Sequence, residues 1–274
     1  MKGLTIQVVA RSRLALVLTM AALLAGCGRR DDAGALAHSA VGADGDYLPP
    51  PALSGVTLSP GSRLSLTGDA TPGLTVRLAS PTGQAQSSLA DERGQWRIDV
   101  AEAGEPRLFG LSMSDRAGKR TVQAQGYLAI LPGGQAAQLR AGAGAQVFGA
   151  ALGGVRILAL DYDRQGGAVV AGVAAPGATI GVRVDGVQRG QNTTDAEGRF
   201  EVSLSEPLAR GEHQIEASDG EHQARTVAPV SPAPTLSGGP YRAERVSLGW
   251  RIDWLTPGGG MQSTIIMDRP GGGA

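Results

Sequence analysis

Four side chains of this 274-residue chain would carry the most telling chemistry: one cysteine and three histidines. Cys27 stands alone, so it can form neither an intramolecular disulfide nor a cysteine cluster for zinc or iron–sulfur. The histidines are His38, His213 and His222, and no two of them have the short spacing of a metal-ligating pair. The sequence therefore predicts no metal site, and it favours exposed polar roles for the histidines.

The carboxylates and hydroxyls give no stronger sign of catalysis. Asp161, Asp163 and Asp185 could bind calcium, but no Asp-x-Asp-x-Asp-Gly loop is present, so turns with solvated carboxylates are favoured. The nucleophilic-serine motifs, the phosphate-binding loop and a dinucleotide-binding glycine motif opening a helix are absent as well. A pair of glycosidase carboxylates stays open, because such residues meet only in the fold. We expect a protein that is not an enzyme, with no catalytic residue and no cofactor.

The position of Cys27 gives it a specific use. Residues 1–13 hold three basic residues and no acidic one, and residues 14–25 are apolar. A basic segment before a short apolar stretch is typical of a secretory signal peptide, and about 12 apolar residues are too few to span a bilayer comfortably. The stretch ends in Leu24-Ala25-Gly26-Cys27, which resembles a bacterial lipobox. An ordinary signal peptide with an incidental cysteine is the alternative.

The lipobox resemblance implies cleavage between Gly26 and Cys27 and attachment of a diacylglyceryl group to the cysteine sulfur. Two or three acyl chains would hold the protein on a membrane, since each buried methylene contributes roughly 0.8 kcal/mol. Residue 28 is Gly rather than Asp, which by resemblance to Gram-negative lipoproteins favours the outer membrane over the inner one. We therefore expect a lipid-anchored protein of the cell envelope, bound to the membrane through Cys27.

The composition excludes several other classes. With 42 Gly, 16 Pro and only 4% aromatic residues, the chain is unlike one large α/β enzyme domain, and 42% hydrophobic residues is too many for full disorder. The formal net charge is zero. Residues 1–26 hold three of the 25 basic residues and none of the 25 acidic ones, so the mature chain would carry a net charge of −3. Neither value suits a nucleic-acid-binding protein, which needs a basic face.

Beyond a tether with three consecutive prolines at 49–51, the chain repeats itself at an offset of 104 residues. The matching motifs are Pro72-Gly73 with Pro176-Gly177, and Asp91-x-x-Gly94-x-Trp96 with Asp195-x-x-Gly198-x-Phe200. Several matches at one offset, with no insertion between them, indicate a duplicated module. An offset this long indicates a duplicated domain rather than a solenoid repeat.

Each copy predicts short β-strands. Apolar and polar residues alternate over 76–78 and 96–100 in the first copy and over 180–184 and 200–204 in the second. This period of two is typical of a half-buried antiparallel strand. The Pro-Gly pairs suit type II turns, and Asp-x-x-Gly predicts a turn in which the Asp side chain caps its own backbone. Short strands with frequent turns indicate a β-sandwich.

These motifs resemble those of bacterial immunoglobulin-like domains of surface proteins, and they are similar to the carboxypeptidase-regulatory-like, transthyretin-type sandwich. The resemblance covers about 55–133 and 154–232. It implies two tandem Ig-like β-sandwiches. It implies no activity, because the family has no catalytic or metal-binding residues to carry over and such folds host many functions.

The end of the chain predicts a β-hairpin. A strand over 245–254 would place Trp250 and Trp254 on one face, and residues 261–267 can return as the second strand. An isolated hairpin is marginal in water, so this apolar face must pack on something. Packing on the second sandwich or on the middle segment is favoured. The alternative makes Trp250 and Trp254 a partner surface, since tryptophan is enriched in binding hot spots.

The expected fold is all-β: two tandem Ig-like β-sandwiches plus a C-terminal β-hairpin, after a signal peptide and a flexible tether. The parts are a signal peptide (1–26), the lipidated cysteine and tether (27–54), the first domain (55–133), an Ala/Gly-rich connector (134–153), the second domain (154–232), and a connector with the hairpin (233–274). Whether the Ala/Gly-rich connector contributes strands is left open.

The expected function follows from the anchor, the tether and the two sandwiches. We expect a non-enzymatic, lipid-anchored envelope protein that serves as a spacer or binding scaffold, with an envelope protein or a glycan as its partner. The alternative is an accessory subunit of an envelope or secretion assembly that docks through the C-terminal hairpin.

Overall fold

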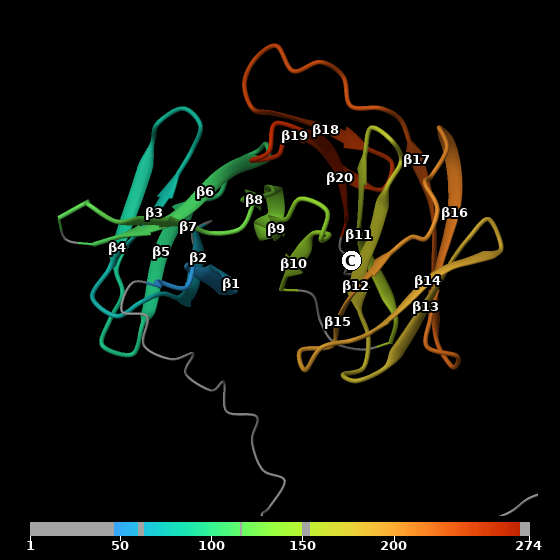
Figure 1. The fold of residues 1–274 in the computed structure, drawn as a ribbon, viewed down its shortest axis with the longest axis horizontal. Coiled ribbons are helices and arrows are strands. Elements are labelled where there is room, and N and C mark those ends of the chain that lie inside the picture. Colours follow the sequence, from blue (N-terminus) through green and yellow to red (C-terminus); the bar gives the residue numbers. More distant parts are fainter. Residues whose placement is uncertain (1–46, 60–62, 116, 150–153, 269–274) are drawn as a thin grey trace, which may run out of the picture. The chain divides into compact units, whose positions relative to one another are not determined.

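The structure, a computed structural model, describes residues 47–59, 63–115, 117–149 and 154–268. Within these ranges the chain consists of β-strands joined by turns, with a single 3-10 turn, η1 (Pro132–Gly134), as the helical element (Figure 1). The expected all-β fold class is confirmed. Within the same ranges no helix is long and apolar enough to span a bilayer. The predicted signal peptide, Gly26 and Cys27 lie outside the described residues.

The first sandwich has two antiparallel sheets, with orders β1-β2-β5 and β10-β9-β8-β6-β3-β4, and β7 also pairs with β6. Its strands are β1 (Ala52–Ser59), β2 (Arg63–Asp69), β3 (Thr75–Ala79), β4 (Ala85–Leu89), β5 (Gln95–Ala101), β6 (Arg107–Ser114), β7 (Thr121–Gln123), β8 (Tyr127–Ile130), β9 (Ala136–Leu139) and β10 (Gln146–Phe148). Leu64, Leu66, Val76, Trp96 and Met113 are part of one buried cluster between these sheets.

The second sandwich also has two antiparallel sheets, with orders β15-β12-β11-β20-β19-β18 and β14-β13-β16-β17. Its strands are β11 (Arg156–Asp163), β12 (Ala168–Val173), β13 (Thr179–Val184), β14 (Val187–Thr193), β15 (Arg199–Ser203), β16 (Gly211–Ser218), β17 (Gln223–Val230), β18 (Tyr241–Val246), β19 (Gly249–Leu255) and β20 (Met261–Met267). Its core includes Leu160, Val170, Ile180, Phe200 and Ile215.

The duplication is visible strand by strand. At the 104-residue offset, β1 corresponds to β11 and β6 to β16 with identical bounds. The β1–β2 and β11–β12 ladders carry a register shift at equivalent places, between Leu53 and Gly55 and between Ile157 and Ala159. The β13–β16 ladder is displaced by two residues relative to β3–β6. A displacement of two keeps the same side chains on each face, so the core survives it.

The motifs shared by the copies have a steric cause. Gly68 pairs with Trp96 across β2 and β5, and Gly172 pairs with Phe200 across β12 and β15. A Cβ added to either glycine would lie 2.0 Å from a backbone oxygen of the neighbouring strand and within 2.6 Å of the aromatic ring. Only glycine leaves room for the ring at this position.

The predicted turns also form. The Leu74 N–H donates to the Thr71 carbonyl at 3.2 Å, and Gly73 has φ of 74°, as a type II turn after Pro72 requires. In the next turn Asp91 Oδ1 accepts the backbone N–H groups of Arg93 and Gln95, each at 2.8 Å.

The Ala/Gly-rich connector, which the sequence left open, contributes two strands to the first sandwich. Strand β9 pairs with β8 and β10 with β9, so this sheet continues as far as Phe148. Both faces of these strands are buried: Ala136 and Phe148 lie in the core of the first sandwich, and Ala137 and Val147 in a separate cluster.

The C-terminal region differs in one respect from the predicted two-stranded hairpin. The strand expected over 245–254 is broken by a two-residue turn at Ser247 and Leu248, since Val246 pairs with Gly249. The hairpin of β19 and β20 therefore has a third strand, β18, before it. Strand β20 pairs with β11, so all three belong to the second sandwich's larger sheet.

A third apolar cluster, here called the joining core, lies between the two sandwiches. Leu139 and Val147 contribute from the first sandwich, and Leu158, Ile252 and Ile266 from the larger sheet of the second. Gln135 adds a buried hydrogen bond from its side-chain amide to the Met267 carbonyl, at 3.1 Å. The central strands of that larger sheet are consequently buried on both faces, as the pattern of β12 shows.

Candidate binding groove

The structure separates the two tryptophans that the sequence proposed as a partner surface. Trp254 is fully buried, and its indole N–H donates to Thr264 Oγ1 at 3.1 Å. Its ring meets that of Tyr127 edge-on, with centroids 5.8 Å apart and planes at 88°. Trp254 therefore packs in the joining core, consistent with the packing interpretation that the sequence favoured.

Trp250 is only half-buried and lines a groove. The Arg245 guanidinium carbon lies 5.5 Å from the centre of its ring. This distance is within the range of a cation–π contact. Of the two proposed residues, Trp250 is the one with surface left for a ligand.

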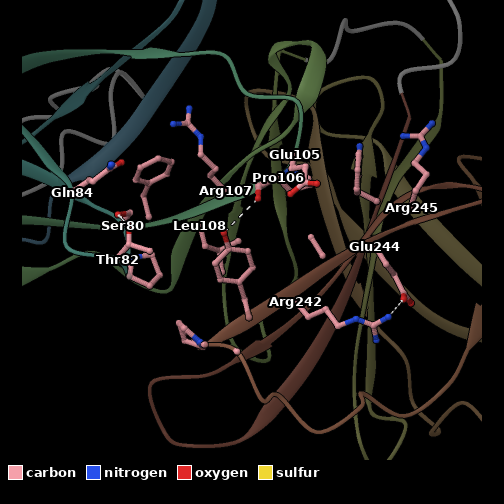
Figure 2. A pocket seen from close by; sticks show the side chains of 18 residues that line it. Ser80, Thr82, Gln84, Glu105, Pro106, Arg107, Leu108, Arg242, Glu244 and Arg245 are labelled. Carbon is pink, nitrogen blue, oxygen red and sulfur yellow. Dashed lines mark hydrogen bonds and ion pairs between the residues drawn. The ribbon is translucent and has the colours of Figure 1, made fainter.

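The groove, called here the β18 groove, has a volume of about 600 Å³. Its walls come from segments far apart in the chain: the β3–β4 turn, the start of β6 with the residues just before it, strand β18 with the residues just before it, and Trp250 on β19. The lining residues are 80–82, 84, 105–109, 238–245 and 250. The hydrogen bond from the Tyr241 hydroxyl to the Pro106 carbonyl, at 3.4 Å, links the two sandwiches at this place (Figure 2).

The charged side chains of the groove are three arginines, Arg107, Arg242 and Arg245, and two glutamates, Glu105 and Glu244. Arg242 is paired with Glu244. Guanidinium groups stay protonated at ordinary pH, so they can bind and orient anionic or polar groups but cannot serve as bases.

Aromatic surface is available beside these charges. The guanidinium of Arg107 lies 5.3 Å from the ring centre of the nearly buried Phe109, and Trp250 and Tyr241 are both half-buried. Flat apolar faces next to guanidinium donors suit the binding of a peptide or a sugar ring.

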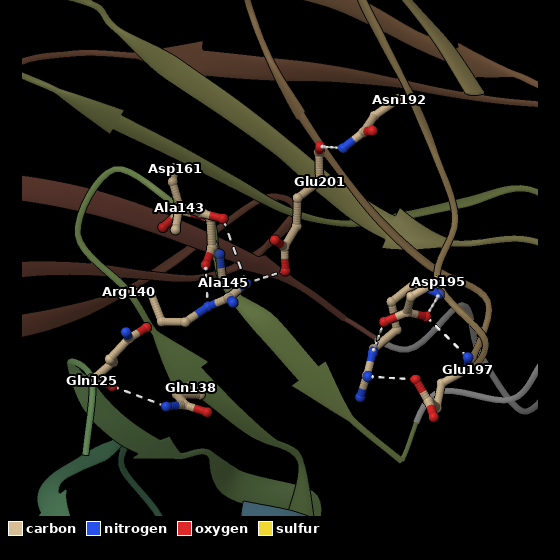
Figure 3. A network of polar contacts seen from close by, with 12 residues as sticks. Gln125, Gln138, Arg140, Ala143, Ala145, Asp161, Asn192, Asp195, Glu197 and Glu201 are labelled. Carbon is tan, nitrogen blue, oxygen red and sulfur yellow. Dashed lines mark hydrogen bonds and ion pairs between the residues drawn. The ribbon is translucent and has the colours of Figure 1, made fainter. Parts of the chain in front are cut away.

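A second polar centre lies where the Ala/Gly-rich connector meets β11 (Figure 3). Asp161 is 1% exposed; its Oδ2 accepts the Ala145 N–H at 2.7 Å, and its Oδ1 accepts the Thr264 hydroxyl at 2.5 Å. Burial raises the pKa of Asp161 to about 6, although both hydrogen bonds and the charge of Arg140 act to lower it. The carboxylate thus connects the first sandwich to the second at an electrostatic cost.

Arg140 surrounds this centre with further contacts. It pairs with Glu201 on β15, and its Nε donates to the Gly144 carbonyl at 3.3 Å (Figure 3). Asn192 on β14 donates to the Glu201 carbonyl at 2.8 Å. These contacts already occupy the charged groups, so this centre has a structural role: it ties the connector of the first sandwich to the second.

The remaining residues singled out in the sequence have local partners. His213 lies 2.7 Å from Asp185 and 2.9 Å from the Ala209 carbonyl. Partial burial works to lower the pKa of His213, but these hydrogen bonds outweigh it and raise the pKa. Asp163 caps its own turn by accepting from the backbone of Gln165 at 2.8 Å. Asp161, in contrast, is buried rather than solvated, so the expected solvated turn is wrong for this residue.

The sequence did not predict the β18 groove. No group of three or more His, Cys, Asp or Glu suited to a metal occurs in the part of the chain that the structure describes, and His38 lies outside it. The groove's signal in the sequence was limited to Trp250. Tyr241, Arg107 and Phe109 come together only in the fold, where the Tyr241 hydroxyl at the start of β18 bonds to the Pro106 carbonyl just before β6.

Comparison with known proteins gives little guidance. No family model and no curated protein matches the chain. Among solved structures, the BSP domain of a biofilm-associated protein is 12% identical with a TM-score of 0.25, covering 68% of this chain and 30% of that one. The central fibronectin-III array of RIM-binding protein is 13% identical with a TM-score of 0.25, covering 82% and 87%.

A third structure, a 1.5-MDa bacterial ice-binding adhesin, is 11% identical with a TM-score of 0.21, and the alignment covers 75% of this chain and 80% of that one. At TM-scores this low, none of the three likenesses carries a conclusion about this chain.

Proposed function

We propose that the chain is a lipid-anchored protein of the cell envelope that binds a partner without catalysing a reaction. The anchor would be Cys27, the outer membrane is favoured over the inner one, and two Ig-like sandwiches would carry the binding surface. The single observation that supports binding is the β18 groove, where arginines lie beside half-buried aromatic rings. An envelope protein or a glycan would suit this lining.

The joined construction of the sandwiches supports a scaffold role. The groove takes walls from both sandwiches, and the joining core holds those walls at a fixed spacing. Preorganised walls lower the entropic cost of binding. Independent sandwiches on a flexible linker would have no such shared site.

The second candidate is an accessory subunit of an envelope or secretion assembly that docks through the C-terminal strands. The observation that favours it is the position of β18 at the edge of its sheet. In this case the groove would hold a protein segment rather than a glycan.

The test uses the full chain in detergent, exposed to envelope proteins and to purified cell-wall glycans, with bound material identified by mass spectrometry. The variant Arg107→Ala/Trp250→Ala should lose most of the bound material. The control Arg225→Ala, an exposed arginine on β17, should retain it. Retention by the groove variant, or turnover of a substrate by the unmodified chain, would contradict the proposal.

The anchor has its own test. Labelled palmitate should appear on the unmodified protein in cells and should be absent from Cys27→Ala. Labelling that persists in Cys27→Ala would contradict the lipid attachment.

A further inference from the structure

Strand β18 has a free edge. Within the described part of the chain it pairs with β19 alone, at the end of the order β15-β12-β11-β20-β19-β18. An edge strand presents a row of unpaired N–H and C=O groups that can template a further strand. The other strands at sheet ends are β1, β4, β5, β10, β14, β15 and β17. Of these, β4 and β5 lie against each other, as do β14 and β15, and β10 and β17 lie against β11.

The ladder decides which backbone groups of β18 face outward. The Leu255 N–H donates to the Pro240 carbonyl at 2.9 Å, so the residues of β18 at even numbers bond toward β19. Hydrogen-bonded and non-hydrogen-bonded pairs alternate in an antiparallel ladder. The N–H and C=O groups of Tyr241, Ala243 and Arg245 therefore point away from β19.

We propose that two copies of this chain associate through β18, as antiparallel strands related by a two-fold axis at Ala243. In that register the outward groups of Ala243 meet those of the partner's Ala243, and Tyr241 stands opposite the partner's Arg245. Arg242 then stands opposite the partner's Glu244, twice by symmetry. These two sites are the non-hydrogen-bonded pairs, where cross-strand side chains approach most closely.

The charges of β18 favour pairing with a second copy rather than opposing it. Natural edges are protected by charges such as lysine, which repel in any self-pairing. In β18, Arg242 is exposed and Glu244 half-buried, and they already form an ion pair within the chain. In an antiparallel pair of two copies, Glu244 of each strand therefore meets Arg242 of the other. A two-fold symmetric contact of this kind is the commonest form of protein dimer.

Charge exchange tests the register. In the full chain in detergent, sedimentation velocity over a concentration series should show a dimer. Arg242→Glu alone, or Glu244→Arg alone, places like charges at both sites and should weaken the dimer about ten-fold or more. Mixing the two single variants should restore association, and so should Arg242→Glu/Glu244→Arg in one chain, because each arrangement again pairs opposite charges.

A matched control lies on β5, where Arg97 and Asp99 have the same spacing and form an ion pair. The single substitutions Arg97→Glu and Asp99→Arg should each leave the dimer unchanged. A monomer at every concentration, or a dimer insensitive to both single variants, would overturn the proposal. A complex with a different protein would also overturn it, if the single variants lost that complex and the double exchange did not restore it. That result would show that β18 binds a foreign partner rather than a second copy.

A cross-link tests the axis directly. Opposed residues in a hydrogen-bonded antiparallel pair have Cα atoms about 5.5 Å apart, within disulfide range. Ala243→Cys should therefore form a covalent dimer under mild oxidation. The unmodified chain and Leu89→Cys, exposed on β4, should not. Equal cross-linking of Leu89→Cys and Ala243→Cys would contradict a specific contact at β18.

Discussion

The two copies of the duplicated module share their strand order but differ in what lies outside their first sheet. In the first copy the sheet β1-β2-β5 turns a polar outer face to solvent, with Ser54 and Asp69 exposed. In the second copy the equivalent positions are Leu158 and Val173, which are 4% and 3% exposed in the joining core. Both copies keep the same inner face.

The inner face is therefore common to both copies and specifies the module, whereas the residues of the outer face depend on whether another part of the chain covers it. The pairs Gly68 with Trp96 and Gly172 with Phe200 are conserved between the copies because both sandwiches need them. Thr57 in the first copy corresponds to Asp161 in the second, where a polar residue has been kept inside the covered face. Two hydrogen bonds offset part of the cost of burying that carboxyl.

The largest expected loss of stability comes from a substitution in the covered outer face of the second copy. Leu158→Asp would place a carboxylate in the joining core without a partner, and we expect a loss of about 5 kcal/mol or more in unfolding free energy. Ser54→Asp, at the equivalent open position, should change it by no more than about 0.5 kcal/mol. Urea unfolding followed by circular dichroism measures both. Equal effects of the two substitutions would contradict the difference between the outer faces.

The next effect separates the two tryptophans of β19. Trp254→Ala should cost about 3–5 kcal/mol, because it empties a fully buried site in the joining core. Trp250→Ala should cost about 1–2 kcal/mol, because its side chain is half-exposed in the groove. The same urea titrations apply. If Trp254→Ala cost less unfolding free energy than Trp250→Ala, Trp254 would not be part of the joining core.

A third effect depends on pH and on Asp161. Burial raises the pKa of Asp161 from 3.8 to about 6, so the folded state holds this proton more tightly than the unfolded chain. The stabilisation is full below about pH 4 and is lost as the pH rises through about 6, by about 3 kcal/mol in all. Relative to the unmodified chain, Asp161→Asn should therefore gain about 3 kcal/mol over this interval.

That gain is read from urea titrations at a series of pH values, as a difference between the two proteins. The difference removes the contributions of other carboxylates such as the half-buried Asp99 and Asp219, whose pKa values are lowered by hydrogen bonds. A difference that stays constant from pH 4 to pH 6 would show that the carboxyl is not buried at the joining core.

The smallest effect concerns a feature that the copies share. Asp91→Ala and Asp195→Ala each remove a side chain that accepts two backbone N–H groups in equivalent turns. Each should cost about 1 kcal/mol. Thermal unfolding of the two variants should give similar losses. A loss confined to one copy would show that the duplicated turns have diverged in energetic role.

Local structure could be predicted from the sequence for strands that bury one face and expose the other. Alternation at 96–100 and 200–204, and the turns before them, depend on neighbouring residues, so periodicity was sufficient. Strand β12 shows the limit: its residues are apolar in succession because both faces are covered, and a pattern of two cannot reveal which partner covers the second face.

The break at Ser247 and Leu248 could not be predicted for a related reason. These residues carry no strong hairpin-turn signal, and alternation continues across them. Gly249 is the residue that the fold requires there: its φ is 149°, and a Cβ would lie 2.2 Å from the Ile266 carbonyl oxygen. That contact comes from β20, so it exists only after the strands have paired. Arg251 and Asp253 are likewise buried as an ion pair, on the face that the sequence treats as polar.

Calorimetric unfolding of the full chain tests whether the two sandwiches form one unit. The joining core should make them unfold together, so we expect one transition whose calorimetric and van't Hoff enthalpies agree. Leu158→Asp should shift or abolish that transition as a whole. Two separate transitions in the unmodified chain, with Leu158→Asp affecting only one of them, would contradict the central claim that the sandwiches form one unit with a shared groove.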